Sequence, residues 1–167
     1  MSADEPLESG ESGESQPTGA DGTDPSMATE GMATEGMATE GAASAEQLTT
    51  IKQQLAAGFR AAGRTGLAEA VSGPDFSLWV TQESGWNPRK VSDRSNQGKV
   101  NGGLFQFWYG HAWAQPFFSR GNDPRGVFTM APADQAQAVV RHFPHVTAAT
   151  VHGYAQQIRN GTYRGWG

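Results

Sequence analysis

One carboxylate in the second half of the chain stands where acid–base chemistry is possible. Glu83 lies in the run WVTQESGWNPRK, residues 79–90, and Pro74 is a favourable first residue for a helix that would contain it. On that helix one apolar stripe is formed by Phe76, Trp79, Val80 and Glu83. A carboxyl group beside such a stripe is partly desolvated, which raises its pKa and keeps it protonated closer to neutral pH. It could then act as the general acid that cleaves a glycosidic bond, and the alternative is a solvated residue at a helix end.

A second motif follows about 20 residues later and strengthens the catalytic interpretation. The first motif reads Glu83-Ser84, with Asn87-Pro88 behind it, and the second reads Gly103-Leu104-x-Gln106. Together, in this order and at this spacing, they resemble the soluble type of the lysozyme-like lytic transglycosylase family. In that family a Glu-Ser pair ends a helix and a Gly-Leu-x-Gln motif follows a loop or hairpin.

The resemblance implies a role for each motif residue. Glu83 would be catalytic, Ser84 would help to position it, and Gln106, in a motif with Gly103 and Leu104, would line the cleft and contact sugar. Aromatic side chains near the two motifs could stack on sugar rings. Those expected to line subsites are Trp86, Phe105, Phe107 and Tyr109.

The chain departs from the family pattern at one position. Members usually carry an Ala-Tyr-Asn motif whose tyrosine contacts the catalytic glutamate, and this tripeptide is absent here. Tyr154, in a predicted helix, is the first candidate for the missing tyrosine. Tyr109 and Tyr163 are alternatives, and an ordinary core or surface tyrosine stays open as well.

A second carboxylate would decide the mechanism. Inverting glycosidases place a base about 6.5–9.5 Å from the acid, and retaining glycosidases place a nucleophile about 5–5.5 Å away. Asp93 follows Glu83 by ten residues in the segment expected to border the cleft, and a simple turn residue is its alternative role. Without a second carboxylate, Glu83 would act alone as acid and then base, which is the transglycosylase mechanism that the resemblance implies. With one, a hydrolytic muramidase follows.

The elements that must position these residues are mostly helical. Ser44-x-x-Gln47 predicts a capping box before an amphipathic helix that ends near Gly63. Further helices are predicted over 67–71, 74–84, 132–142 and 147–159. The polar, Gly-rich stretch 89–106 predicts a loop or short β-hairpin with its turn at residues 101–103. The expected fold class is therefore α+β, mainly α-helical, and the resemblance implies a lysozyme-like fold with a small hairpin beside the cleft.

Charge divides the chain into two predicted regions. Residues 1–50 hold 11 acids and no Lys or Arg, whereas residues 51–167 hold 6 acids and all 12 Lys and Arg, giving −11 and +6. Residues 1–43 have low complexity and include three MATEG repeats, so we expect a disordered acidic tail before a catalytic domain at 44–167. This acidic segment is either a flexible tether or a docking segment for a basic partner, such as another virion protein or a phage tail protein.

Composition narrows the partners. The chain has no cysteine, no His-Glu-x-x-His motif and no phosphate-loop spacing, so we expect neither a metal nor another cofactor. We expect peptidoglycan as the substrate, no nucleic acid partner, and no membrane insertion, because no apolar run approaches a membrane span. A DNA-binding protein remains the alternative for the basic region. The acidic N-terminus is not expected to be a signal peptide. The long segment between the two motifs and the C-terminal GTYRGWG resemble lysozyme-like domains of phage structural proteins. The expected setting is therefore a phage particle acting on the host wall, and an endolysin or an inactive virion protein are the alternatives.

Overall fold

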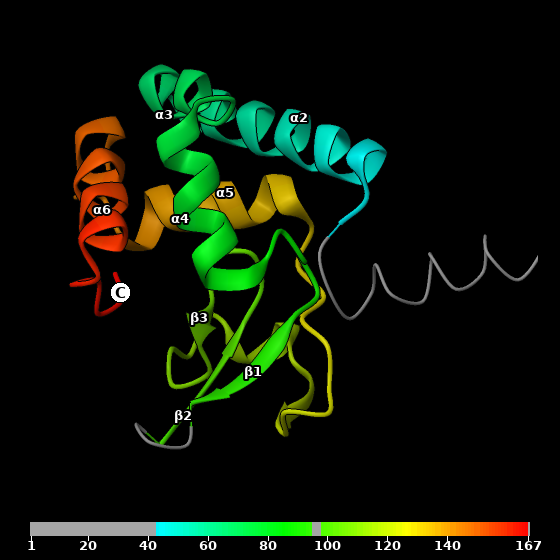
Figure 1. Ribbon diagram of the computed structural model, residues 1–167. Coiled ribbons are helices and arrows are strands. Elements are labelled where there is room, and N and C mark those ends of the chain that lie inside the picture. Colours follow the sequence, from blue (N-terminus) through cyan, green and yellow to red (C-terminus); the bar gives the residue numbers. More distant parts are fainter. Residues whose placement is uncertain (1–42, 95–97, 167) are drawn as a thin grey trace, which may run out of the picture. The chain divides into compact units, whose positions relative to one another are not determined.

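The structure is a computed structural model, and it describes residues 43–94 and 98–166. The predicted acidic tail with its MATEG repeats therefore lies outside the described residues, apart from Ala43. The described part is mainly helical and holds one small three-stranded antiparallel sheet, as Figure 1 shows. No helix in this part of the chain has the length and apolar character needed to cross a membrane.

The first helices follow their predicted signals. Helix α2 spans Ala45–Ala61, and its capping box is formed because Ser44 accepts from the backbone of Gln47 while the Gln47 side chain accepts from the Ser44 backbone. A short helix, α3, spans Thr65–Ala70. Helix α2 crosses a later helix, α5 (Pro132–His142), so closely that a Cβ on Gly58 would clash with the Ala133 carbonyl oxygen. Only glycine therefore fits at this crossing.

Helix α4 spans Pro74–Ser84, as predicted, with proline in its first turn. It ends at Gly85, whose left-handed φ of 64° glycine adopts without strain. Its predicted stripe is confirmed, because the side chains of Phe76, Trp79, Val80 and Glu83 are all buried. The helix therefore presents a carboxylate at the end of an apolar face.

The predicted hairpin forms, but its turn is not where the sequence indicates. Strand β1, Val91–Arg94, pairs antiparallel with β2, Lys99–Gly102, which pairs in turn with β3, Phe107–Trp108. Asn101 and Gly102 are thus strand residues, and of the predicted turn only Gly103 lies in a turn, the one that joins β2 to β3. The turn signal in Asn-Gly-Gly instead marks the end of β2, where Gly103 has φ +85°.

The second half of the chain adds a short 3₁₀ helix, η3 (Gln115–Phe117), strand β4 (Ser119–Asn122), and helices α5 (Pro132–His142) and α6 (Ala148–Asn160). Both α5 and α6 agree with the predicted ranges. Helix α5 packs on α2, and α6 packs on α4. In Figure 1 the sheet lies at the lower end of α4, which is the C-terminal end of that helix and contains Glu83.

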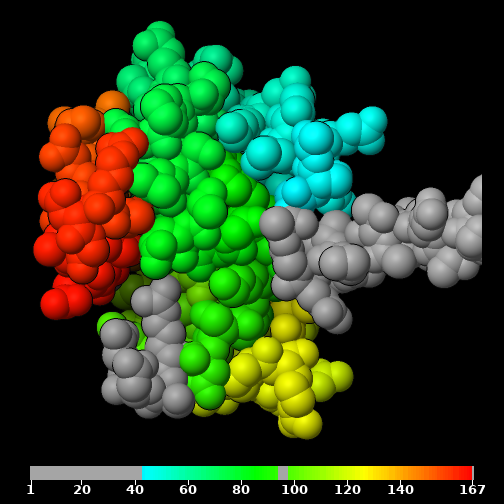
Figure 2. Space-filling model, in the orientation of Figure 1, coloured from blue at the N-terminus to red at the C-terminus, as the bar shows by residue number. Residues whose placement is uncertain are grey.

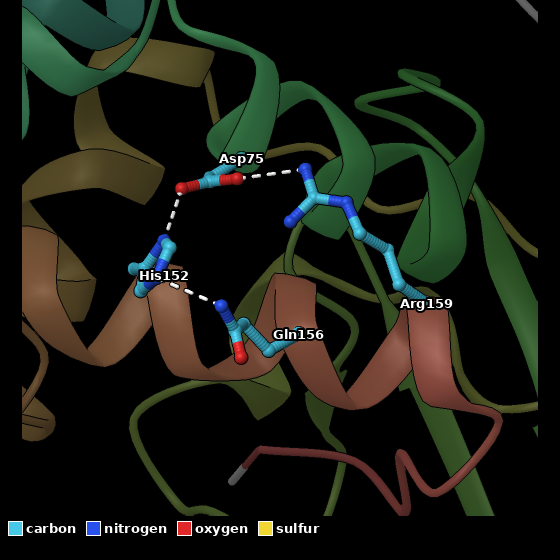
Figure 3. Close-up of polar contacts among 4 residues, drawn as sticks. All are labelled: Asp75, His152, Gln156 and Arg159. Atoms are coloured by element: carbon cyan, nitrogen blue, oxygen red, sulfur yellow. Dashed lines mark hydrogen bonds and ion pairs between the residues drawn. The ribbon is translucent and has the colours of Figure 1, made fainter.

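A polar cluster joins α4 to α6 on the surface (Figure 3). Asp75, in the first turn of α4, accepts from Arg159 at 2.8 Å and pairs with His152 Nδ1 at 2.6 Å. Gln156 lies 3.1 Å from the other ring nitrogen of His152. These hydrogen bonds lower the pKa of Asp75, the bond to His152 most and that to Arg159 next. The cluster fastens α6 to the helix that bears Glu83.

Candidate active site

Glu83 is nearly enclosed by the protein, with 4% of its surface exposed. The hydroxyl of Tyr163 donates a hydrogen bond to Glu83 Oε1 at 2.7 Å. Trp79, one turn earlier on α4, donates from Nε1 to the same tyrosine oxygen at 3.2 Å. Trp79 therefore orients Tyr163, and Tyr163 orients the carboxyl group of Glu83.

Tyr163 is a permanent donor in this arrangement. Burial, followed by the charge of Glu83 and the hydrogen bond to it, raises the pKa of Tyr163 far above its ordinary value. The phenol therefore keeps its proton at any pH near neutrality. A donor of this kind favours the ionised form of a carboxyl group, whereas burial favours the neutral form. The site holds Glu83 between these two opposing influences.

The structure answers which tyrosine lies against the glutamate. Tyr154, the first candidate from the sequence, packs its ring against Trp79 and Tyr163, and no described residue hydrogen-bonds to its hydroxyl. Burial and the charge of Glu83 raise the pKa of Tyr154 too. Tyr163, one of the two alternatives, is the residue that hydrogen-bonds to Glu83.

A pocket of about 300 Å³ opens beside Glu83. One wall comes from the sheet and the residues just after it, namely Lys99, Asn101, Gln106, Phe107, Trp108 and His111. The other comes from the end of α5 and from the C-terminal segment, namely Phe143, Arg164, Gly165 and Trp166. Figure 2 shows the C-terminal segment in red beside the green region that includes α4.

Hydrogen bonds hold the sheet wall in place. Gln106 donates from Nε2 to the Gly103 carbonyl at 2.9 Å and accepts a short hydrogen bond from Ser92 Oγ. Asn101 Nδ2 donates to the Gln106 carbonyl at 2.8 Å. Asn101 Oδ1 is buried and has no hydrogen-bond partner among the described residues. Gln106, the predicted sugar contact, is therefore fixed from two sides at the pocket surface.

The two sequence motifs are joined by Gln135, which the sequence did not single out. Its side chain is fully buried on α5. Oε1 accepts from the Leu104 backbone at 2.7 Å, while Nε2 donates to the carbonyls of Pro88 and Met130 at 3.1 and 2.8 Å. One side chain thus binds the backbone behind both the Glu83 motif and the Gln106 motif.

Three of the predicted site residues line the pocket: Glu83, Gln106 and Phe107. Ser84 lies behind it, where its hydroxyl donates to Val80 and accepts from the Trp86 backbone, so it shapes the turn after α4. Gly103 and Leu104 are buried in the backing loop. A Cβ on Gly103 would lie 2.6 Å from Gln135 Oε1, which explains the glycine.

The aromatic residues Trp86, Phe105 and Tyr109 are not in the pocket lining, contrary to expectation. Trp86 is 5% exposed and packs on Phe76, with its indole nitrogen donating to Thr81. Phe105 is wholly buried, and Tyr109 packs edge-on against Phe118. These three side chains contribute apolar surface to the core. Their positions in the sequence alone do not distinguish a core aromatic residue from one that stacks on a sugar ring.

Asp93 lies on the other face of the hairpin from the pocket. It stands opposite Val100 on β2, whereas the neighbouring Ser92 stands opposite Asn101. Paired residues share a face and successive residues alternate, so Asp93 is on the side of Val100 and away from Asn101. The prediction that Asp93 borders the cleft is wrong, because the strand register places Ser92, and not Asp93, on the face that carries Asn101.

Several residues of the pocket lie outside the two sequence motifs and were not predicted as site residues. Trp166 packs against Phe143 at a centroid distance of 4.7 Å and donates from Nε1 to the Phe105 carbonyl at 2.8 Å. Trp108 is 39% exposed, the one large apolar side chain exposed in the described part of the chain. The signal was present in the tail sequence TYRGW, residues 162–166, where two aromatics follow a predicted helix end with a flexible glycine between them.

The pocket offers acid–base chemistry from a single carboxyl group. Among the described residues that line it, Glu83 is the only acid. No group of three or more His, Cys, Asp or Glu side chains in residues 43–94 and 98–166 could hold a metal ion. His111, the one histidine in the described lining, has its pKa lowered by burial and then by the charge of Lys99.

A second hollow, of about 450 Å³, lies along α2 and the loop after α4. Its acid, Glu46, is an exposed residue of the first turn of α2, so it lacks the enclosure found at Glu83. The smaller pocket is therefore the better candidate for catalysis.

Comparisons with known proteins add no relative. No protein-family model, no curated protein and no solved structure matches this chain.

Proposed function

We propose that this protein is a peptidoglycan-cleaving glycosidase of lysozyme-like fold that acts on the β-1,4 bond between N-acetylmuramic acid and N-acetylglucosamine. The observation that supports it best is the enclosed Glu83, hydrogen-bonded to Tyr163 at one side of a pocket with no other carboxylate in its described lining. The two motifs of the sequence meet at this pocket through Glu83 and Gln106.

Glu83 works first as acid and then as base in this proposal. It donates its proton to the leaving O4 of N-acetylglucosamine as the bond from C1 to that oxygen breaks. The C6 hydroxyl of the same muramyl residue then attacks C1 and gives its proton to the Glu83 carboxylate. The product is a 1,6-anhydro ring, no water is consumed, and Glu83 regains its starting state. The scarcity of carboxylates in the pocket favours this transglycosylase form over hydrolysis.

The substitution Glu83→Gln tests the catalytic assignment. It keeps the shape of the side chain and removes its proton chemistry, so we expect wall-clearing activity to fall by about 10²- to 10⁴-fold. Glu69→Gln, in an exposed acid of α3, is the matched control and should retain full activity. Full clearing by the Glu83 variant would refute the assignment, and circular dichroism would show that both variants are folded.

Mass spectrometry of digested peptidoglycan separates the two reaction types. Muropeptides with 1,6-anhydro ends are expected from transglycosylation. Products that all carry an added water would point to a hydrolytic muramidase at the same site. An absence of any cleavage by the folded protein, with retained wall binding, would instead identify a virion protein that binds peptidoglycan without cleaving it.

In the phage setting that the sequence suggests, such an activity would open the host wall during entry. Infection by particles that contain Glu83→Gln would test this, since their adsorption should be normal and their genome delivery through an intact wall slower.

A further inference from the structure

Two cations stand at the pocket beside the single acid. Lys99 lines the sheet wall and Arg164 lines the C-terminal wall. Neither forms an ion pair with an acidic residue in the part of the chain that the structure describes. Basic side chains at a binding pocket that lack an acidic partner are placed to attract an anionic ligand.

The position of Lys99 is further restricted by Trp108. The ammonium nitrogen lies 5.1 Å from the centroid of the Trp108 ring, within the range of a cation–π contact. Trp108 itself is exposed and lines the same pocket. The contact therefore holds the positive charge of Lys99 at the pocket wall, where it also acts on His111.

The net charge of the lining supports the same conclusion. With Glu83 ionised, Lys99 and Arg164 leave the lining positive, and with Glu83 protonated for the first catalytic step the surplus grows by one. A neutral sugar gains nothing from this field. A sugar that bears a carboxylate gains a charge-assisted contact in the state that is ready to react.

We propose that Lys99 and Arg164 form an anion subsite that recognises a carboxylate on the glycan and so makes the protein selective for acidic over neutral strands. The identity of the glycan rests on the proposed function. The carboxylate has two sources in peptidoglycan, the lactyl group of a muramyl residue without peptide and the stem peptide. Both supply the same chemistry to the two cations.

The experiment compares one glycan in charged and neutral forms. Strands stripped of peptide by an amidase bear free lactyl carboxylates, and conversion of these groups to methylamides removes the charge while keeping the sugars. We expect the KM of the unmodified protein to be about five- to tenfold lower on the charged strands with kcat nearly unchanged, as for one or two partly exposed ion pairs. Peptide-bearing strands, with and without the same amidation, form the second arm.

Substitutions of single cations show which side chains cause the difference in KM between charged and amidated strands. Lys99→Gln and Arg164→Gln should each reduce the difference in KM, and the double variant should abolish it. Lys52→Gln is the matched control, because Lys52 lies 5.2 Å above Trp86 in a similar lysine–tryptophan pair outside the pocket. It should keep the full difference. A higher salt concentration should narrow the difference in the unmodified protein.

Each outcome bears on the proposal. A difference confined to stripped strands identifies the lactyl carboxylate, and one confined to peptide-bearing strands identifies the stem peptide. Equal KM values on charged and amidated strands, with cleavage intact, overturn the anion subsite and leave the glycosidase proposal standing. An equal loss in Lys52→Gln and Lys99→Gln also overturns it, since general charge would then explain the selectivity.

If no strand is cleaved, the glycosidase proposal fails and binding becomes the readout. Titration of Glu83→Gln with the charged and amidated strands, followed by tryptophan fluorescence, should show the same five- to tenfold gap in Kd. Equal affinities in that titration would overturn the subsite as well.

Discussion

At the residue scale the central interaction is the hydrogen bond from Tyr163 to Glu83. Tyr163→Phe removes that donor while keeping the ring in place, and a hydrogen bond to a charged group is worth about 1.5–3 kcal/mol. Because the donor favours the carboxylate, its loss should raise the pH at which Glu83 ionises. We expect the alkaline limb of the kcat/KM profile to move to higher pH.

Tyr154→Phe provides the comparison. Its hydroxyl hydrogen-bonds to no described residue, so its removal should change the pH profile far less than removal of the Tyr163 hydroxyl. A larger shift in the Tyr154 variant would refute the assignment of Tyr163. Tyr163 itself should add no limb to the profile near neutral pH, because its raised pKa keeps the phenol protonated.

Gln135 makes the strongest stability prediction for a single residue. Gln135→Leu keeps the volume but leaves the Leu104 N–H and the carbonyls of Pro88 and Met130 buried without their partner. Each such group costs about 1–3 kcal/mol, so we expect the free energy of unfolding to fall by about 3 kcal/mol or more. Urea denaturation measures it. Gln137→Ala, on the same helix without these bonds, should change stability by less than about 1 kcal/mol.

At the element scale the Asp75 cluster fastens α4 to α6. Asp75→Asn should lower the free energy of unfolding by about 1 kcal/mol at pH 7, since the pairs are partly exposed and Asp75 also favours the start of α4. The pKa of Asp75 is lowered on folding, so its contribution is complete above the unfolded value near 4. It is lost as pH falls through the lower, folded value.

Urea titrations at pH 7 and near pH 2.5 test this dependence. The difference between the unmodified protein and Asp75→Asn should be present at the first pH and shrink at the second. Asp123→Asn is a useful contrast, because among the described residues the ion pair of Asp123 is with Arg125, two residues away, and it links no two helices. A constant difference for Asp75→Asn at both pH values would exclude the ion pairs as its cause.

The elements were predictable to different degrees. Periodicity and end signals located α4 and α5 to the residue, because Pro74 and Pro132 mark helix starts that local chemistry dictates. The hairpin was predictable as a hairpin, but its turn and register were not. Register depends on which face is buried, and a shift of one residue decides whether Asp93 or its neighbour faces the pocket.

Site residues that belong to the two short motifs were predictable. Site residues that come from a distant part of the chain were not. Glu83 and Gln106 could be found because each sits in a recognisable short motif. Tyr163 lies 80 residues from its partner, and only the packing of α6 on α4 brings it there. Trp86 was wrongly predicted to line a subsite, because an aromatic residue next to a catalytic motif can equally pack in the core, as Trp86 does against Phe76.

At the scale of the whole described domain, the pocket is assembled from two parts that the C-terminal segment joins. Trp166 packs against Trp79 of α4 and Phe143, and its indole donates to the Phe105 backbone. Trp108 lines the same pocket but is exposed. The two tryptophans therefore share a candidate binding role and differ in their structural role.

Alanine substitutions should separate these roles. Trp166→Ala removes a half-buried ring and one hydrogen bond, so we expect the free energy of unfolding to fall by about 2–3 kcal/mol, below the cost for a fully buried tryptophan. Because Tyr163 lies three residues earlier, this variant should also move the pH profile as Tyr163→Phe does. Trp108→Ala should lower activity through KM and should destabilise the protein less than Trp166→Ala, because the Trp108 ring is more exposed and its indole donates to no described residue. Equal destabilisation of the two variants would show that the C-terminal segment does not join the two walls of the pocket.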